Sequence, residues 1–264
     1  MISQTFPIFL PATKLERLGK AMASGATAVF LDLEDAVDPA QKADARDGLA
    51  AGLHDLGDFP VFLRINSQET AWYRDDLNAC ASLPLAGIVL PKAEHGSACQ
   101  EVAEVSGKPV IALIETALGI ANIAEVAVGS QQLAFGSIDY ASDLGIAHER
   151  HSLQHARSVI VHAARVAGQA APLDGVTPDV TDPEPVRSDA RYGREMGFGG
   201  KLLIHPAQVQ AAKQGFAPTD AEVAWATRVL EASQGSGAAA KVDGAMIDAP
   251  VIKRAQSILA RLGG

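Results

Sequence analysis

Polar and charged side chains follow most of the short apolar segments of this chain, each at the carboxyl end of its segment. They are Asp32, Glu34 and Asp35 around the end of segment 28–33, Arg64 and Asn66 at 61–65, Lys92 after 87–90, Glu115 after 110–114, Asp139 after 133–136 and His205 after 201–204. If these segments are parallel barrel strands, their carboxyl ends meet at one rim, where barrel enzymes carry their active sites. The spacing therefore predicts one site rather than scattered surface charge.

Glu115 and Asp139 are the candidate metal ligands. They end two consecutive segments, so a barrel would bring both carboxylates to neighbouring positions on the rim. Mg²⁺ takes one or two carboxylates and completes its octahedron with water and substrate oxygens. No Cys-x-x-Cys spacing points to zinc. Structural alternatives remain, with Glu115 in the first turn of a helix and Asp139 as a helix cap.

Arg64 is the candidate substrate-binding cation. A guanidinium at the rim would be buried and needs an anionic partner, and its planar fork matches a carboxylate with two hydrogen bonds. That carboxylate can belong to a substrate, or to Asp32 or Glu34 in an internal ion pair, and both can hold together. Lys92 is open to pairing with the same acidic group, and His205 before Pro206 is interpreted as a hydrogen-bonded structural histidine.

The elements that must position these residues alternate between strand and helix. Apolar runs at 7–11, 28–33, 61–65, 87–90, 110–114, 133–136 and 201–204, with a weaker one at 170–176, suit strands buried on both faces. Between them lie helix-start signals at Thr13-x-x-Glu16, Asp38-Pro39 and Asp182-Pro183. This order predicts an α/β fold, a (β/α)8 TIM barrel, with an open doubly wound sheet as the alternative.

The last fifty or so residues fall outside the eight βα units. Thr219-x-x-Glu222 starts a further helix with a capping box, residues 234–237 indicate a flexible break, and an amphipathic helix follows near 250–262. We expect a catalytic barrel over residues 1–216 and a helical extension over 217–264. The extension can pack on its own barrel or on a neighbouring subunit.

Composition limits the function classes. Apolar residues form 48% of the 264 residues, enough for a sizeable core, and the formal charge of −9 without a basic run argues against nucleic-acid binding. No stretch indicates a membrane span or a secretory signal. Cys80 and Cys99 cannot form a disulfide framework and are expected to be buried thiols. These features predict a cytoplasmic protein that acts on a small molecule.

Several motifs resemble the citrate lyase β-subunit family, within the HpcH/HpaI aldolases and citrate lyases. The resemblance covers nearly the whole chain in order. It rests on Asp32-Leu33-Glu34-Asp35-Ala36-Val37 with Lys42 and Arg46, Arg64-Ile65-Asn66, Leu90-Pro91-Lys92, Glu115-Thr116 with Gly119, Gly136 to Tyr140, Gly197 to Lys201 and Ile204-His205-Pro206-Ala207-Gln208.

The resemblance implies a trimeric TIM barrel that uses Mg²⁺ and a coenzyme A thioester. Glu115 and Asp139 would hold the metal, Arg64 would bind the carboxylate or keto acid end of the substrate together with Glu115, and Asp32, Glu34, Asp35 and Lys92 would support them. Asp248 matches an aspartate that reaches a neighbouring active site in malyl-CoA lyases, although it can equally cap the last helix. The implied reaction cleaves a citryl-CoA or malyl-CoA type substrate to acetyl-CoA and a keto acid.

One departure from the family pattern concerns the first strand. Family members commonly carry an arginine before this strand and a glycine after it, whereas this chain lacks the arginine and has Ala12 in place of the glycine. Tight coenzyme A binding is therefore less assured. The alternatives are a metal-dependent pyruvate-type aldolase without coenzyme A, a malyl-CoA thioesterase, and a non-catalytic subunit of a lyase complex.

Overall fold

The structure is a computed structural model that describes residues 6–53, 57–235 and 241–263. The chain forms two compact units, Met1–Lys213 and Gln214–Gly264. Helix α10 (Gln208–Phe216) continues past that division, and the next helix begins after Thr219. We therefore keep 1–216 and 217–264 as the proposed domains, since a boundary between two helices leaves both hydrogen-bond ladders intact.

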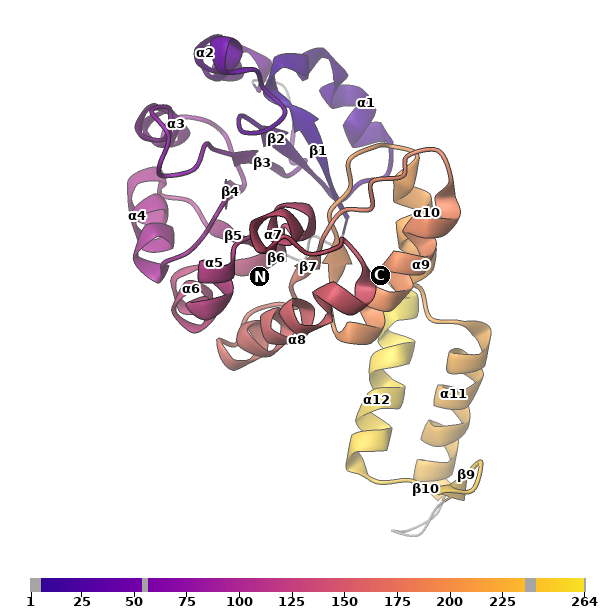
Figure 1. The fold of residues 1–264 in the computed structure, drawn as a ribbon. Coiled ribbons are helices and arrows are strands. Elements are labelled where there is room, and N and C mark those ends of the chain that lie inside the picture. The colour runs from indigo at the N-terminus through magenta and orange to yellow at the C-terminus, as the bar shows by residue number, and fades with distance from the viewer. Residues whose placement is uncertain (1–5, 54–56, 236–240, 264) are drawn as a thin grey trace. The chain divides into compact units, whose positions relative to one another are not determined.

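Eight parallel strands form one sheet in sequential order, and Figure 1 shows them ringed by helices. They are β1 (Pro7–Pro11), β2 (Ala28–Asp32), β3 (Val61–Arg64), β4 (Gly87–Leu90), β5 (Val110–Ile114), β6 (Gln132–Phe135), β7 (Leu173–Asp174) and β8 (Gly200–Lys201). Ile8 of β1 bridges Leu203 beyond β8, and the Phe9 amide donates to the Leu203 carbonyl at 2.8 Å. The strands thus close into a TIM barrel, as predicted, and the open-sheet alternative is wrong.

Helices connect successive strands. They are α1 (Leu18–Ala23), α2 (Lys42–Gly52), α3 (Tyr73–Cys80), α4 (Gly96–Ser106), α5 (Ala117–Ala121), α6 (Ile123–Gly129), α7 (Ser137–Leu144), α8 (Arg150–Val166), α9 (Pro183–Met196) and α10. Asp38 and Asp182 cap the turns that they precede, each accepting a backbone hydrogen bond at 2.9 Å. The capping box expected at Thr13 is wrong, because the chain enters a 3-10 turn directly from Pro11 without a side-chain cap. Cys80 and Cys99 are buried, as expected.

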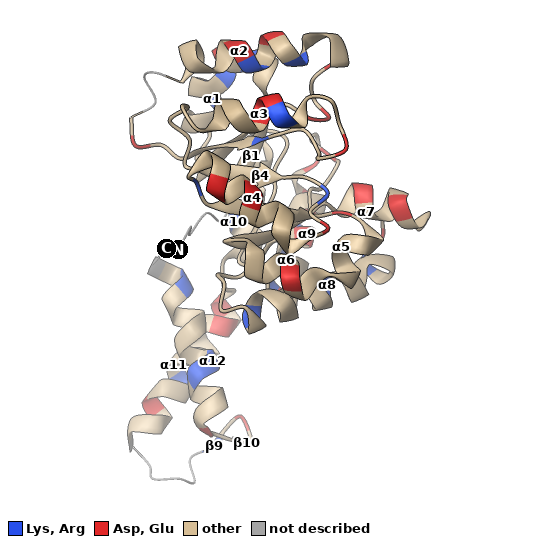
Figure 2. Ribbon diagram, turned by 90° about the vertical axis from the view of Figure 1, so that its left-hand side faces the viewer, with Lys and Arg blue, Asp and Glu red and all other residues tan. Residues whose placement is uncertain are grey.

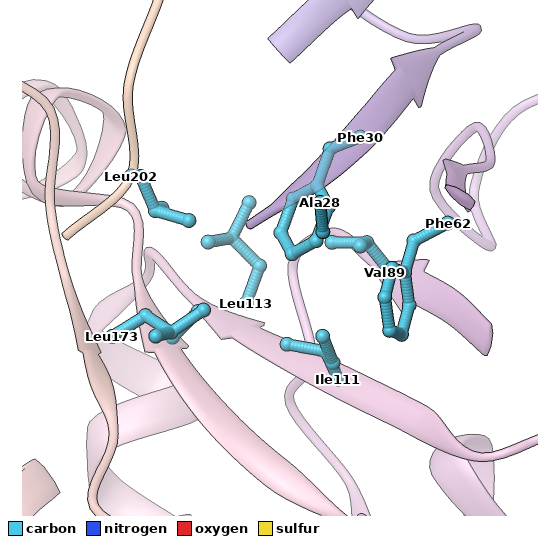
Figure 3. Packing of buried hydrophobic residues seen from close by; sticks show 9 residues of the cluster. Ala28, Phe30, Phe62, Val89, Ile111, Leu113, Leu173 and Leu202 are labelled. Carbon is cyan, nitrogen blue, oxygen red and sulfur yellow. The ribbon is translucent and has the colours of Figure 1, made fainter. Parts of the chain in front are cut away.

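The barrel interior explains how the rim residues come to point inward. Its buried side chains are Ala28, Phe30, Phe62, Val89, Ile111, Leu113, Ala134, Leu173 and Leu202, most of them labelled in Figure 3. Side chains alternate across a strand, so the position two residues after an inward residue also faces inward. Phe30 is followed in this way by Asp32, Phe62 by Arg64, and Leu113 by Glu115. The same alternation that builds the core therefore places these charges at its top.

The second unit is a helical hairpin formed by α11 (Asp220–Gly235) and α12 (Ala249–Ala260), with a short ribbon of β9 (Lys241–Val242) and β10 (Ala245–Met246). Its core consists of Ala226, Val229, Ile247, Ala255 and Ile258. The predicted capping box is confirmed, since Thr219 and Glu222 exchange hydrogen bonds of 2.7 and 3.2 Å. The predicted break at 234–237 falls partly outside the described residues. Within the described ranges, no helix combines the length and apolarity that a membrane crossing needs.

Candidate active site

A cavity of about 540 Å³ opens at the carboxyl end of the barrel strands. Five charged residues predicted for the site line it, namely Asp32, Asp35, Arg64, Glu115 and Asp139. An apolar floor continues from the barrel core and includes Phe9, Leu113, Phe135, Val176 and Leu202. The volume and the mixed lining are those of a pocket for a small polar ligand with an apolar portion.

Glu115 is almost completely buried, with 2% of its surface exposed. Its Oε1 accepts a hydrogen bond of 2.7 Å from the backbone N–H of Lys92, whose φ of 45° lies in the left-handed region. Oε2 lies against Gly136, where any Cβ would collide with the carboxylate. Among the described residues, Oε2 receives no hydrogen bond. One carboxylate oxygen is thus fixed by the backbone, and the other is left for a ligand.

Asp139 lies in the first turn of α7, close to the cavity wall formed by Gly136 and Ser137. Its carboxylate forms no ion pair with a described side chain. Burial, together with the charge of Asp35, raises its pKa above the usual value. The helix-cap alternative does not describe it, because Gly136 is the N-cap of α7 and no side-chain hydrogen bond caps that helix. The Asp139 carboxylate therefore also remains available to a ligand.

Arg64 is held by three carboxylates. Its Nε and Nη2 donate to the two oxygens of Asp32 at 2.8 and 2.6 Å, and Nη1 lies 2.9 Å from Glu34 and 3.3 Å from Asp35. The guanidinium also stacks on Phe9, with 4.9 Å to the ring centroid. The internal ion pair that the sequence left open is thus present. Arg64 nevertheless lines the cavity, in addition to forming this ion pair.

Glu34 and Lys92 adjoin the cavity and hold its wall together. Lys92 Nζ lies 2.9 Å from Glu34 Oε1, while Glu34 Oε2 faces Arg64. Burial raises the pKa of Glu34, an effect that Arg64 and Lys92 partly oppose. The pKa of Lys92 is raised as well, because its burial is outweighed by the hydrogen bond and charge of Glu34. The predicted pairing of Lys92 with the acidic group is confirmed.

The charges around the cavity do not balance. Five carboxylates, those of Asp32, Glu34, Asp35, Glu115 and Asp139, face Arg64 and Lys92. Burial raises the pKa of Glu115 to about 8, reinforced by Glu34 and opposed by Arg64. A divalent cation would offset this excess and favour ionised Glu115. Among the described residues, no three His, Cys, Asp or Glu side chains are arranged so that they could hold a metal ion by themselves. The residues present therefore fit an open Mg²⁺ site and not a closed protein cage.

Two further predicted residues form local hydrogen bonds. Asp248 belongs to the second unit, where its Oδ1 caps α12 by accepting a 3.0 Å hydrogen bond from Val251 N. His205 accepts a hydrogen bond of 3.2 Å from Ala207 N, which agrees with its structural interpretation. Gln208 in the same motif is buried, and its amide bonds the carbonyls of Thr177 and Asp179.

The sequence patterns predicted no role for a buried polar cluster next to the site, although Asn66 follows a predicted strand and Lys42 and Arg46 belong to a family motif. The cluster comprises Lys42, Arg46, Asn66 and Asp76. Lys42 lies on the buried stripe of α2 with Ala45 and Leu49. A lysine at a position where helix spacing predicts an apolar residue is unusual, and this spacing was the sequence signal that could have identified Lys42 as buried. It went unassigned because long cations on helices are more often solvated.

Comparisons with known proteins bear on the family. A model of the HpcH/HpaI aldolase/citrate lyase family matches residues 5–206. The chain belongs to this family. A citrate lyase subunit beta-like protein from Deinococcus radiodurans is 36% identical, over 96% of this chain and 95% of that protein. A (3S)-malyl-CoA thioesterase from Cereibacter sphaeroides is 35% identical, over 96% of this chain and 93% of that protein.

A solved structure of a similar protein has the same fold over the full length. The crystal structure of CitE from Mycobacterium tuberculosis in complex with magnesium, acetoacetate and coenzyme A superposes with a TM-score of 0.89. It is 35% identical and covers 100% of this chain and 99% of that one. The family membership that the sequence motifs indicated is thereby confirmed.

Proposed function

We propose that this chain is a Mg²⁺-dependent carbon–carbon lyase. Its substrate would be a 3-hydroxy acid acyl-CoA of the citryl-CoA or malyl-CoA type, cleaved to acetyl-CoA and a keto acid. The observation that carries the proposal is the meeting of Glu115, Asp139 and Arg64 in one cavity at the carboxyl end of the barrel. Similar proteins are named as citrate lyase subunits, and one was crystallised with magnesium, acetoacetate and coenzyme A.

Glu115 and Asp139 would hold the metal through the oxygens that the protein leaves uncommitted. When bound, Mg²⁺ supplies positive charge next to the oxygen atoms of the substrate hydroxyl and carboxylate. The Lys92 N–H keeps the Glu115 carboxylate in one orientation. Because that donor is part of the backbone, its position does not have to be organised during the reaction.

Arg64 would bind the carboxylate of the keto acid portion. It is the positive side chain among the cavity-lining residues that the structure describes, and Asp32 fixes its plane with two hydrogen bonds. The apolar floor keeps water away from the bond that breaks, which strengthens the electrostatic interactions within the site. Cleavage turns the carbon that carries the hydroxyl into the carbonyl carbon of the keto acid and releases the hydroxyl proton to a base. The bonding electron pair goes to the α-carbon of the thioester, and the resulting enolate takes up a proton to give acetyl-CoA.

For that base we propose Asp248 of a neighbouring subunit, in a cytoplasmic homotrimer. The proposal rests on the motif resemblance, in which Asp248 matches the aspartate that reaches a neighbouring active site in malyl-CoA lyases. Mixing equal amounts of Glu115→Gln and Asp248→Asn chains tests it. If sites are shared between subunits, about a quarter of the wild-type activity is expected after subunit exchange, since one site in four combines both intact residues. About half of the wild-type activity, with the Asp248→Asn chain active on its own, would place Asp248 outside the reaction, and inactive mixtures would place it in the site of its own chain.

A thioesterase is the second candidate, because some 35% identical relatives carry the name (3S)-malyl-CoA thioesterase. The same cavity would then admit water to the thioester carbonyl. The two activities differ in their products. A lyase converts malyl-CoA or citryl-CoA to acetyl-CoA and a keto acid without free thiol, whereas a thioesterase releases coenzyme A and the intact hydroxy acid.

Product analysis of the purified chain with Mg²⁺ therefore tests the proposed function. We expect keto acid and acetyl-CoA in equal amounts, and no turnover after treatment with EDTA. Free thiol without keto acid would establish the thioesterase instead. Cleavage of free hydroxy acids would identify an aldolase that does not need coenzyme A. A chain that turns over none of these substrates would contradict an enzymatic role.

A further inference from the structure

Lys42 lies in a buried position beneath the charged wall of the cavity and does not line the cavity itself. Figure 2 shows that α2 and α3 carry both basic and acidic residues. On α2, Asp44 and Asp47 are exposed, whereas Lys42 keeps only 5% of its surface accessible. A lysine so deeply buried needs partners for each of its three N–H donors, since an unpaired buried charge is strongly destabilising.

All three donors of Lys42 are used. Its Nζ lies 2.7 Å from the carbonyl oxygen of Leu33, 2.6 Å from that of Glu34 and 2.7 Å from Oδ1 of Asn66. The ring of Trp72 lies 5.2 Å from the same nitrogen. Burial lowers the pKa of Lys42, against the charges of Asp32 and Glu34. An apolar residue would fill this helix stripe without that desolvation, so packing alone does not account for a lysine here.

The partners of Lys42 show what it holds. Leu33 and Glu34 form the start of the loop after β2, between Asp32 and Asp35. Asp32 holds the same loop from the cavity side, accepting hydrogen bonds from Glu34 N at 2.8 Å and Ala36 N at 3.1 Å. The loop backbone is thus held on one side by the ammonium of Lys42 and on the other by the carboxylate of Asp32. This fixes the orientation of the Glu34 and Asp35 side chains, which pair with Arg64.

Asn66 extends the connection to the next strand. It follows Arg64 by two residues, and both its N–H and its Nδ2 donate to Oδ2 of Asp76, at 3.0 and 2.6 Å. Asp76 is fully buried and faces Arg46 at 3.5 Å. Lys42 therefore ties the loop after β2 to the end of β3, the two segments that supply the ion pairs of Arg64.

We propose that Lys42 is a positioning residue for keto acid binding. It fixes the loop carrying Glu34 and Asp35 relative to Arg64, and it does not contact the substrate. This role rests on the proposed function only through the carboxylate-binding role of Arg64. Loss of Lys42 weakens keto acid binding while the proposed metal ligands, which lie directly after β5 and in the first turn of α7, stay in place.

The variants Lys42→Met and Lys42→Ala test this role, with Lys20→Met on the exposed face of α1 as the matched control. For Lys42→Met we expect the Kd of pyruvate or glyoxylate in the presence of Mg²⁺ to rise about tenfold or more, the scale seen when a residue that orients a ligand-binding side chain is replaced. The Kd of Mg²⁺ alone should change less than threefold. Hydrogen exchange in a peptide spanning residues 33–36 should speed up relative to the remaining barrel. Lys20→Met should change none of these.

Chemical rescue separates positioning from loss of folding. n-Propylammonium has the atoms that Lys42→Ala removes beyond Cβ, and we expect it to restore keto acid affinity and loop protection, whereas n-propanol should not. A lower melting temperature with unchanged keto acid Kd and unchanged exchange at 33–36 would overturn the proposal. If wild type binds keto acid but cleaves no acyl-CoA, the proposed function fails while the affinities still decide the role of Lys42. If wild type binds no keto acid, the role of Lys42 fails with it.

Discussion

Replacing Glu115 with Gln is expected to abolish turnover and to weaken Mg²⁺ binding by at least ~100-fold, since even residues that only orient a metal ligand through a hydrogen bond contribute about 10–100-fold. Gln keeps the shape of the side chain and its oxygen can still accept from Lys92 N. The substitution removes the negative charge of one of the two proposed metal-binding carboxylates, those of Glu115 and Asp139. Calorimetric titration with Mg²⁺ and measurement of kcat check both effects. Asp139→Asn should act in the same direction.

The fold should survive this substitution. Burial already raises the pKa of Glu115 to about 8, so the charged form is disfavoured in the metal-free protein, and a neutral amide relieves the repulsion from Glu34. We expect the melting temperature without metal to be equal to or higher than that of wild type. Glu104→Gln on the exposed face of α4 is the matched control and should leave Mg²⁺ binding unchanged. Normal metal affinity in Glu115→Gln would remove Glu115 from the metal site.

Replacing Arg64 with Lys is expected to raise the KM of the acyl-CoA substrate by about 10–100-fold and to destabilise the fold by ~1–3 kcal/mol. Lysine retains the charge but cannot make the two parallel hydrogen bonds to Asp32, and it cannot reach Glu34 and Asp35 at the same time. Arg64→Ala would leave buried carboxylates without a cation, at a cost of ~3–5 kcal/mol, so the milder change is the better test.

Arg74→Lys provides the comparison for Arg64→Lys. Arg74 pairs with Glu101 at 2.8 Å, but its side chain is 62% exposed. Surface ion pairs contribute ~0–1 kcal/mol, and Arg74 does not line the cavity, so neither KM nor the unfolding midpoint in urea should move much. If both variants behave alike, the interactions of Arg64 have no special role in binding or stability.

Much of the candidate site could be predicted from the sequence because barrel geometry is periodic. Once 110–114 is identified as a strand with Leu113 facing inward, Glu115 must face inward as well, and the same holds for Phe62 and Arg64. The role of Lys42 could not be predicted in this way. Its role depends on carbonyl groups of a loop and on Asn66, which lies 24 positions away along the chain. No local pattern reports such a contact.

The sequence by itself determined the barrel, the order of its strands and the rim on which Asp32, Arg64, Glu115 and Asp139 lie. These features follow from apolar runs and side-chain alternation, which are local properties of the chain. Only the tertiary structure decided which atoms of these residues form hydrogen bonds within the protein. It showed that Asp32 binds Arg64 with both oxygens, that Lys92 N–H holds one oxygen of Glu115 and that Lys42 secures the loop below. Hydrogen bonds depend on distances of a few tenths of an ångström between residues far apart in the chain, and folding alone sets those distances.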